Sequence, residues 1–277
     1  MPAASLKVAA GDGLDGAAEI GDDCRQENPF PDPRPLIPVP SHMSYPGGKA
    51  APGVFQRIIN QIPPHMTFIE PFAGDAAVSR AIRPAERTIL VDLDADQLIH
   101  LAETFDRQGC ELHQADGVSW LKHCAGLTRV DKRPKRDPNI VAYLDPPYPM
   151  HTRRGGRIYR YEMTDEQHDD LLNVAADLPF ACLISSYPNQ RYDETLADWR
   201  TIDFQTTDRG GNRRTERLYM NFPEPAELHD YRYLGDDKRQ RERIARRRRN
   251  WLAGLKRASP LERRAILDAC QQAVGEG

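Results

Sequence analysis

The strongest constraint on the fold is a repeated alternation of short apolar segments with segments of helical periodicity. Between residues 67 and 124, three strand-like segments are each followed by a segment with apolar residues at helical spacing. The apolar runs IVAYL (140–144) and FACLISS (180–186) then flank another helical segment, which opens with Thr164 and Gln167 as a capping box. Strands that alternate with helices predict a mostly parallel sheet with helices on both faces.

The pattern changes in the last third of the chain. The segments WRTIDFQTT and RTERLYMNF flank a Gly-Gly-Asn turn at 210–212 and predict an antiparallel hairpin. Beyond Pro225, two long basic segments read as helices. The expected domains are a disordered segment at 1–40, rich in Ala, Gly, Asp and Pro, a globular α/β domain at 41–225, and a basic helical extension at 226–277.

Charge is distributed unevenly along the chain. The formal net charge is -3, yet residues 231–264 carry thirteen Lys or Arg against four Asp or Glu. This segment is therefore +9, which leaves about -12 for the rest. Such a split favours a tail that faces nucleic acid, and the alternative is a solvated basic helix without a partner.

Other features narrow the class of protein. The five cysteines form no CxxC pair, so we expect reduced thiols and no metal. No apolar run reaches the roughly 18 residues that a membrane span needs, and the N-terminus lacks the basic and apolar regions of a secretory signal. The expectation is a cytoplasmic protein without membrane contact.

Acidic side chains follow the first four predicted parallel strands. They are Glu70, Asp92, Asp116 and Asp145. Ligands of parallel sheets bind beyond the carboxyl ends of the strands, so we expect the four acids to lie in one site. Taken singly, each could instead be a helix N-cap or a turn residue.

The turn after the first strand narrows the choice of ligand. FIEPFAGDAAV brings backbone amides close to a ligand, but Gly74 stands alone where a dinucleotide fingerprint needs three glycines. Glu70 would repel a phosphate and attract a cation. Asp92 suits ribose hydroxyls, and Asp116 suits an adenine amino group. S-adenosylmethionine meets these demands.

At this point the motifs carry a resemblance. SYPGGK, FIEPFAG, LVDLD and LDPPY, in this order, resemble the Dam-type (D12 class) DNA adenine methyltransferases, as do the later MTDEQHDDLL, LISSYP and RTERLYMNF. The resemblance covers residues 44–223. It implies a Rossmann-like S-adenosylmethionine-dependent methyltransferase fold and methyl transfer to the N6 amine of a flipped adenine in duplex DNA. It also implies a cofactor site made by Tyr45, Lys49, Glu70, Phe72, Gly74, Asp92, Asp116 and Asp145.

The DPPY loop has residue types that suit this chemistry. The N6 lone pair of adenine is delocalised into the ring, and acceptors for both amino hydrogens favour the geometry in which it can attack. Asp145 can accept one hydrogen, and the carbonyl of Pro146, held by two prolines, can accept the other. Tyr148 offers a face on which the flipped base can stack. Lys49 would meet a carboxylate, either that of the methionine or Asp145.

Two departures from the family concern the turn and base recognition. Ala76 stands where a second glycine is frequent, and only 28 residues separate Asp116 from Asp145, too few for a separate recognition domain. We therefore expect short or relaxed sequence specificity. The candidate DNA contacts lie in the segments 151–161 and 208–214 and in the run RRRRN, and are Arg153, Arg154, Arg157, Arg213, Arg214, Arg246, Arg247, Arg248 and Arg249.

Three other functions compete with adenine methylation of DNA. The same chemistry could act on RNA adenine or on cytosine N4, since both are planar amines. A nucleic-acid-binding protein without catalysis is a different class, although the catalytic residues look intact. A nicotinamide-dependent dehydrogenase is disfavoured by the missing glycines.

Overall fold

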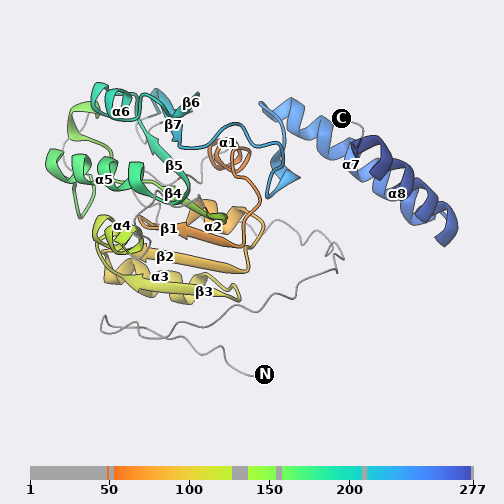
Figure 1. Ribbon diagram of the computed structural model, residues 1–277, viewed down its shortest axis with the longest axis horizontal. Helices are drawn as coiled ribbons and strands as arrows, with labels where there is room; N and C mark the ends of the chain where they lie inside the picture. The colour runs from red at the N-terminus through yellow and green to blue at the C-terminus, as the bar shows by residue number, and fades with distance from the viewer. Residues whose placement is uncertain (1–48, 50–52, 127–136, 154–157, 208–210, 276–277) are drawn as a thin grey trace.

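The computed structural model describes residues 49, 53–126, 137–153, 158–207 and 211–275. Figure 1 shows a sheet covered by helices and a helical arm that projects from one side of the domain. The strands are β1 (Thr67–Glu70), β2 (Arg87–Asp92), β3 (Cys110–Gln114), β4 (Asp137–Leu144), β5 (Phe180–Ser186), β6 (Arg200–Thr207) and β7 (Arg213–Met220). The helices are α1 (Val54–Ile59), α2 (Ala77–Ala81), α3 (Ala95–Thr104), α4 (Gly117–Gly126), α5 (Asp165–Asp177), α6 (Gln190–Thr195), α7 (Lys238–Arg257) and α8 (Pro260–Gly275), with 3-10 turns η1 (Met150–Thr152) and η2 (Tyr231–Tyr233).

The sheet has the order β3-β2-β1-β4-β5-β7-β6. Strands β1 to β5 pair in parallel, whereas β7 runs antiparallel to both β5 and β6. The expected fold class is therefore confirmed: a mostly parallel Rossmann-like α/β sheet with a C-terminal antiparallel hairpin. The strand order reverses between β1 and β4, and ligands bind at such switch points.

Two apolar layers hold the helices on the sheet, because successive strand residues point to opposite faces. Ile69, Ala142 and Ile184 belong to a buried cluster with side chains of α4, α5 and α6. Their neighbours Phe68 and Val141 belong to a second cluster with α1 and α2. A third cluster packs α3 against β2. The loops after the parallel strands are thereby held at one edge of the sheet.

A local signal placed the start of α5 correctly. The Thr164 hydroxyl accepts a hydrogen bond from the Gln167 amide, and the Gln167 side chain accepts from the Thr164 amide, as the expected capping box requires. Helix α6 was not predicted; Asn189 caps it by accepting from the Tyr192 amide at 3.1 Å. This helix has six residues, too few for its periodicity to stand out in the sequence.

Some expectations lie outside the described residues, including the disordered segment 1–40, and the domain boundaries at 41, 225 and 226 stay predictions. Within the described part of the chain, no disulfide joins the cysteines, and no group of His, Cys, Asp and Glu has the arrangement of a metal site. Among the same residues, no helix combines the length and the apolar character needed to cross a membrane.

Candidate active site

A cavity opens at the carboxyl ends of the parallel strands, and it brings together the predicted acids. Its walls come from the loops that follow β1, β2, β3 and β4, together with the segment 159–163. Most of the predicted cofactor residues line it, namely Lys49, Glu70, Phe72, Gly74, Asp92, Asp116 and Asp145. Tyr45 lies outside the described residues. The four acids that follow the parallel strands therefore lie in one cavity, as expected.

The turn after β1 is tight and held from two sides. Gly74 has a φ of 45°, a value that favours glycine, and its amide donates to the Asp92 carboxylate at 2.8 Å. Gly117, after β3, approaches the same turn so closely that a Cβ atom would lie 2.2 Å from the carbonyl oxygen of Pro71. A side chain at position 117 would therefore displace the wall of the cavity.

Ala76 is the residue that carries backbone strain in this turn. It is buried, it precedes α2, and it has a φ of 50°, which a side chain disfavours by roughly 1–2 kcal/mol. Glycine adopts this conformation freely but is more flexible in the unfolded chain. We expect Ala76→Gly to raise the free energy of unfolding by up to about 1 kcal/mol, measured by denaturant unfolding. The matched variant Ala102→Gly, inside α3, should lower it by about 1 kcal/mol; equal losses in both variants would contradict the strain.

Asp92 organises the end of β2. Its two carboxylate oxygens accept from the amides of Gly74 and Asp94, at 2.8 and 2.9 Å. Burial raises the pKa of Asp92, and these amide bonds oppose the rise. A carboxylate fixed in this way can offer its remaining lone pairs to ligand hydroxyls, as expected for a ribose.

Glu70 is a buried acid with spare bonding capacity. One oxygen accepts from the Ser79 amide at 3.3 Å, and Oε2 has no hydrogen-bond partner among the described residues. Burial raises the pKa of Glu70 to about 8, and the bond from Ser79 only partly offsets it. A cationic ligand in the cavity would stabilise the ionised form of this side chain.

Asp116 combines a structural role with its place in the cavity. Its Oδ1 accepts from the Ser119 amide at 2.8 Å and so caps the start of α4. One oxygen of Asp116 therefore acts as a helix N-cap, the role that the sequence analysis gave as the alternative to ligand binding. The residue also lines the cavity, so a contact of its other oxygen with an adenine amino group stays a prediction.

The centre of the site is a buried cluster of charges around Lys49. The ammonium donates to Asp145 Oδ1 at 2.6 Å and to the Tyr148 hydroxyl at 2.7 Å, and it lies 3.1 Å from Glu216 Oε1. Glu216 also accepts from the hydroxyls of Tyr148 and, at 2.6 Å, Ser185. The sequence left two carboxylates as partners of Lys49, that of the methionine and Asp145. In the structure Lys49 pairs with Asp145. One cation thus lies between two carboxylates, one of which belongs to the DPPY loop.

Burial and neighbouring charges set the protonation of this cluster. Burial raises the pKa of Asp145 to about 6; Lys49 opposes the rise and Glu216 adds to it. Burial alone would lower the pKa of Lys49, but the charges of Asp145 and Glu216 outweigh it and hold this pKa above its ordinary value. Near neutral pH the cluster therefore contains an ammonium and an ionised Asp145.

Glu216 belongs to this buried cluster but is absent from the site residues predicted from the sequence. It lies on β7, in phase with Leu218 and Met220, which point into the core. Alternation along RTERLYMNF would place a glutamate on the buried face, and a buried acid needs a partner. That signal was present in the sequence, although its partner Lys49 was not evident.

The remaining members of the DPPY loop are largely buried. Pro146 is buried, and Pro147 lines the cavity. The Tyr148 ring is 4% exposed and meets the ring of Tyr187 edge to face, with centroids 4.7 Å apart. Stacking of a base on Tyr148 stays a prediction, and Tyr159 and Tyr161 are further aromatic side chains on the cavity wall.

The segment that follows the DPPY loop is tied down by its own arginines. The Arg153 side chain is 6% exposed and pairs with Glu162 at 2.5 Å, so it braces the loop. Its expected contact with DNA stays a prediction. The same glutamate accepts from the amides of Ile158 and Tyr159. Arg160 links this loop to the end of β2 through Asp94 at 2.9 Å. Arg154 and Arg157 lie outside the described residues.

The other candidate arginines occupy two different edges of the domain. Arg213 and Arg214 begin β7, which runs antiparallel to β5, so they lie at the carboxyl edge with the cavity. The Arg214 guanidinium lies 5.8 Å from the ring centre of Tyr187. The run Arg246, Arg247, Arg248 and Arg249 is part of α7, which projects from the domain in Figure 1.

The fold and the cavity define a Rossmann-like α/β protein with a ligand site at the switch point of its sheet. No family model matches the chain, and no curated protein matches it. Among solved structures, a methyltransferase from Escherichia coli is 19% identical over 58% of this chain and 76% of that chain, with a TM-score of 0.34. A SAM-dependent methyltransferase from Agrobacterium tumefaciens is 9% identical, with coverages of 60% and 58% and a TM-score of 0.37.

A methyltransferase from Streptococcus mutans, solved in complex with SAH, is 10% identical over 60% of this chain and 94% of that chain, with a TM-score of 0.34. These matches are distant. The chemistry of this chain is therefore inferred from the residues of its own cavity.

Proposed function

We propose that this protein is an S-adenosylmethionine-dependent methyltransferase that acts on the N6 amine of adenine in DNA. The observation that carries the proposal is the meeting of Glu70, Asp92, Asp116 and Asp145 with Lys49 in one cavity at the switch point of the sheet. The sequence LDPPY places an acceptor at the end of β4, where an amine can reach it.

The cavity fits the proposed cofactor. S-adenosylmethionine supplies a methyl group on a positively charged sulfur and also carries an ammonium group. The spare oxygen of Glu70 suits a cation, which would stabilise the ionised form of this side chain. Asp92, fixed by two backbone amides, suits the ribose, and Phe72 supplies an apolar wall for a base.

The catalytic role falls to Asp145. Lys49 donates to its Oδ1, which fixes the orientation of the carboxylate. The second oxygen is the proposed acceptor for one hydrogen of the substrate amine. As the nitrogen attacks, positive charge develops on it and the hydrogen bond to the carboxylate strengthens, so the bond favours the transition state over the ground state. The carbonyl of Pro146 is the proposed acceptor for the second amino hydrogen.

Base recognition is proposed for the carboxyl edge of the sheet. Arg213 and Arg214 lie there, beside the end of β5. The loop at 151–161 borders the cavity, although its Arg153 is committed to Glu162. Short or relaxed specificity is proposed for this edge. Methylation mapping on defined duplexes would contradict it by finding a strict site of six or more bases.

The decisive experiment identifies the methylated atom. The protein is incubated with labelled S-adenosylmethionine and either duplex DNA or RNA, and the product is digested to nucleosides. We expect N6-methyldeoxyadenosine. N6-methyladenosine from RNA, or N4-methyldeoxycytidine, would show that the same chemistry acts on another amine. If no product carries label, the alternative is a nucleic-acid-binding protein without catalysis.

A further inference from the structure

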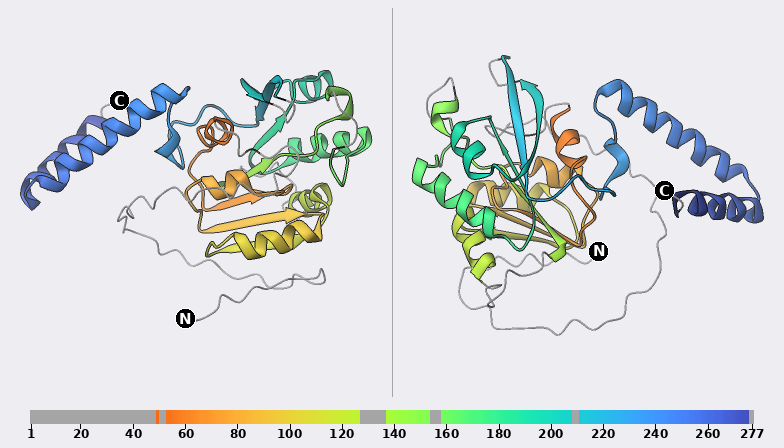
Figure 2. Two further views of the ribbon diagram at one scale, coloured as in Figure 1. Left: turned by 180° about the vertical axis from the view of Figure 1, so that it is seen from behind. Right: turned by 45° about the horizontal axis from the view of Figure 1, so that its top comes forward.

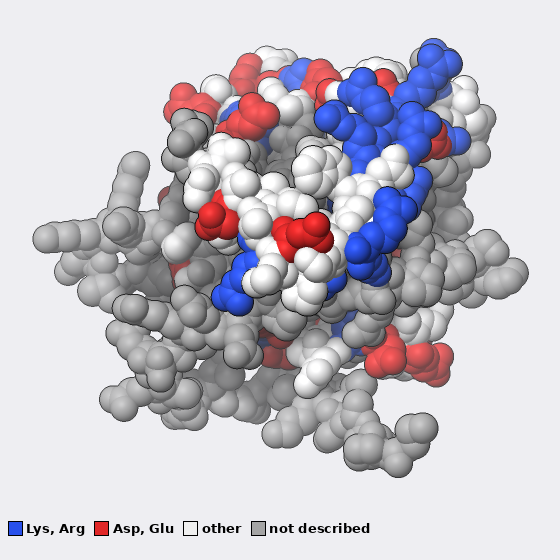
Figure 3. Space-filling model, turned by 90° about the vertical axis from the view of Figure 1, so that its right-hand side faces the viewer, with Lys and Arg blue, Asp and Glu red and all other residues white. Residues whose placement is uncertain are grey.

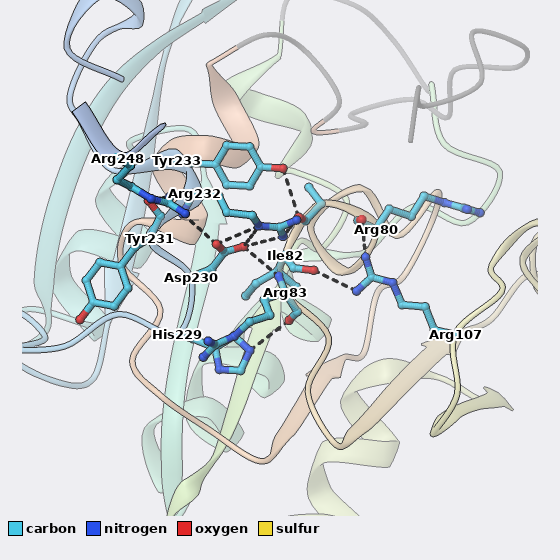
Figure 4. Close-up of polar contacts among 11 residues, drawn as sticks. Arg80, Ile82, Arg83, Arg107, His229, Asp230, Tyr231, Arg232, Tyr233 and Arg248 are labelled. Carbon is cyan, nitrogen blue, oxygen red and sulfur yellow. Dashed lines mark hydrogen bonds and ion pairs between the residues drawn. The ribbon is translucent and has the colours of Figure 1, made fainter. Parts of the chain in front are cut away.

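The C-terminal arm, formed by α7 and α8, is fixed to the edge of the domain opposite the cavity. Asp230 is buried, and it accepts from the Arg83 amide at 2.9 Å and from the Arg232 guanidinium at 2.6 Å (Figure 4). Arg232 also donates to the carbonyl of Ala81 at 2.6 Å. Residues 81–83 come shortly before β2, so the attachment lies at the amino ends of the strands.

A second set of contacts places the arm at the same edge. His229 donates its amide to the carbonyl of Ile62 at 2.9 Å, and its ring stacks on His65 with centroids 3.8 Å apart. Ile62 and His65 directly precede β1. The cavity, in contrast, lies at the carboxyl ends. The arm is therefore attached at the edge opposite the cavity, and the expected contact of its arginine run with DNA phosphates stays a prediction.

Helix α7 has two different sides. Arg248 donates to the carbonyl of Tyr231 at 3.2 Å, and Arg241 donates to that of Gly235 at 3.4 Å, so both turn back toward the domain. Ile244, one turn away, is half-buried. Arg239, Arg243, Arg246 and Arg257 are exposed and follow helical spacing along the other side.

This outer side is strongly positive. Helix α7 carries ten basic residues and one acid, Glu242, which lies 3.9 Å from Lys238. Figure 3 looks at the side of the molecule that carries the arm and shows Lys and Arg gathered in a band. Arginine dominates over lysine, and its planar guanidinium binds phosphates through two parallel hydrogen bonds.

We infer that the outer face of α7 (Arg239, Arg243, Arg246 and Arg257) binds the sugar-phosphate backbone of nucleic acid, separately from the target base in the cavity. Twenty helical residues extend about 30 Å, close to one turn of duplex DNA. Outside residues 231–264 the chain has a charge of about -12 and would repel a polyanion, which the arm offsets. The choice of nucleic acid rests on the proposed function.

An anionic membrane surface is the competing partner, because α7 is amphipathic and Trp251 is 60% exposed. The apolar side of an interfacial helix must lie on the bilayer. Between Arg241 and Arg248 that side faces the segment 231–235, which joins the arm to the domain, so this segment stands where the bilayer would be. The views in Figure 2 show that α7 begins beside the domain and that most of the arm stands clear of it. Nucleic acid on the opposite, basic face avoids this conflict.

The test compares two triple variants of the full chain. Arg239→Gln, Arg243→Gln and Arg246→Gln neutralise the outer face, and Arg83→Gln, Arg87→Gln and Lys122→Gln remove three exposed charges from the domain. Binding to a duplex of about 40 base pairs is measured by fluorescence anisotropy over a range of salt. Each lost phosphate contact should lower the salt slope by about 0.9 and weaken binding about fivefold near 0.15 M salt. The control variant should keep the slope of the unmodified chain.

Three outcomes separate this inference from the proposed function. Equal slopes for both variants overturn the inference even if adenine is methylated. A loss of binding to anionic phosphatidylserine vesicles, with duplex binding unchanged, also overturns it and assigns the face to a membrane. A lower slope in the face variant supports it, even if the unmodified chain transfers no methyl group to adenine. As a second measure, the ratio of kcat/KM on long to short duplexes should fall in the face variant.

Discussion

Asp145→Asn is expected to lower the rate of adenine methylation by at least about 10²-fold, the usual effect of removing one charge-stabilising group from a transition state. The amide keeps the shape of the side chain but loses the negative charge that the substrate nitrogen needs as it becomes positive. Lys49 retains Glu216 as a partner, at 3.1 Å, so the variant should still fold. Single-turnover methylation of a duplex measures the loss.

Cofactor binding and thermal unfolding are the controls, and both should resemble those of the unmodified chain. Near-normal turnover would contradict the role of Asp145. The unmodified chain offers an independent check through pH. Asp145 must be ionised to act as a charged hydrogen-bond acceptor for the amine. Its pKa is raised to about 6, so kcat/KM should fall as the pH is lowered through this value. A flat profile between pH 5 and 7 would remove this carboxylate from the mechanism.

Glu216→Ala is expected to lower the free energy of unfolding by about 3 kcal/mol, because it removes a charged partner from the buried Lys49. It also removes the acceptor for the Tyr148 and Ser185 hydroxyls. Glu216→Gln has the same shape and can still accept hydrogen bonds, so its loss of stability should be clearly smaller. Denaturant unfolding at neutral pH compares the two.

The glutamine variant also tests whether Glu216 acts on the DPPY loop through charge. Glu216 raises the pKa of Asp145, so removing its charge should lower that pKa. The acid limb of kcat/KM should therefore move below pH 6 in Glu216→Gln. A merely structural Glu216 would leave this limb in place. A shift toward higher pH would contradict the arrangement of charges around Lys49.

The sequence predicted the fold well because the signals were local and repeated. Alternating strands and helices determined a parallel sheet, and acids at the strand ends determined which edge would hold the site. Gly74 and Asp92 could be assigned to one site from their place after successive strands, and the structure adds the hydrogen bond that joins them.

Contacts between distant segments could not be predicted in this way. Lys49 and Glu216 are separated by most of the domain in sequence, and nothing local to either one indicates the other. Arg153 was predicted as a DNA contact because its segment follows the DPPY loop and mixes Arg with Tyr, and nothing in that pattern indicates its ion pair with Glu162. The charged residues could be identified from the sequence, but their partners depend on how the loops pack.

By itself, the sequence determined a parallel α/β sheet, an acidic ligand edge and a basic tail, because strand periodicity, strand ends and charge are properties of short segments. Only the tertiary structure decided that Lys49 lies between Asp145 and Glu216, and that the tail leaves from the opposite edge. Both facts follow from packing, since a buried charge takes its partner from whichever segment the core brings near. The stretch that attracts attention in the sequence, LDPPY, thus depends on a glutamate 71 residues beyond Asp145.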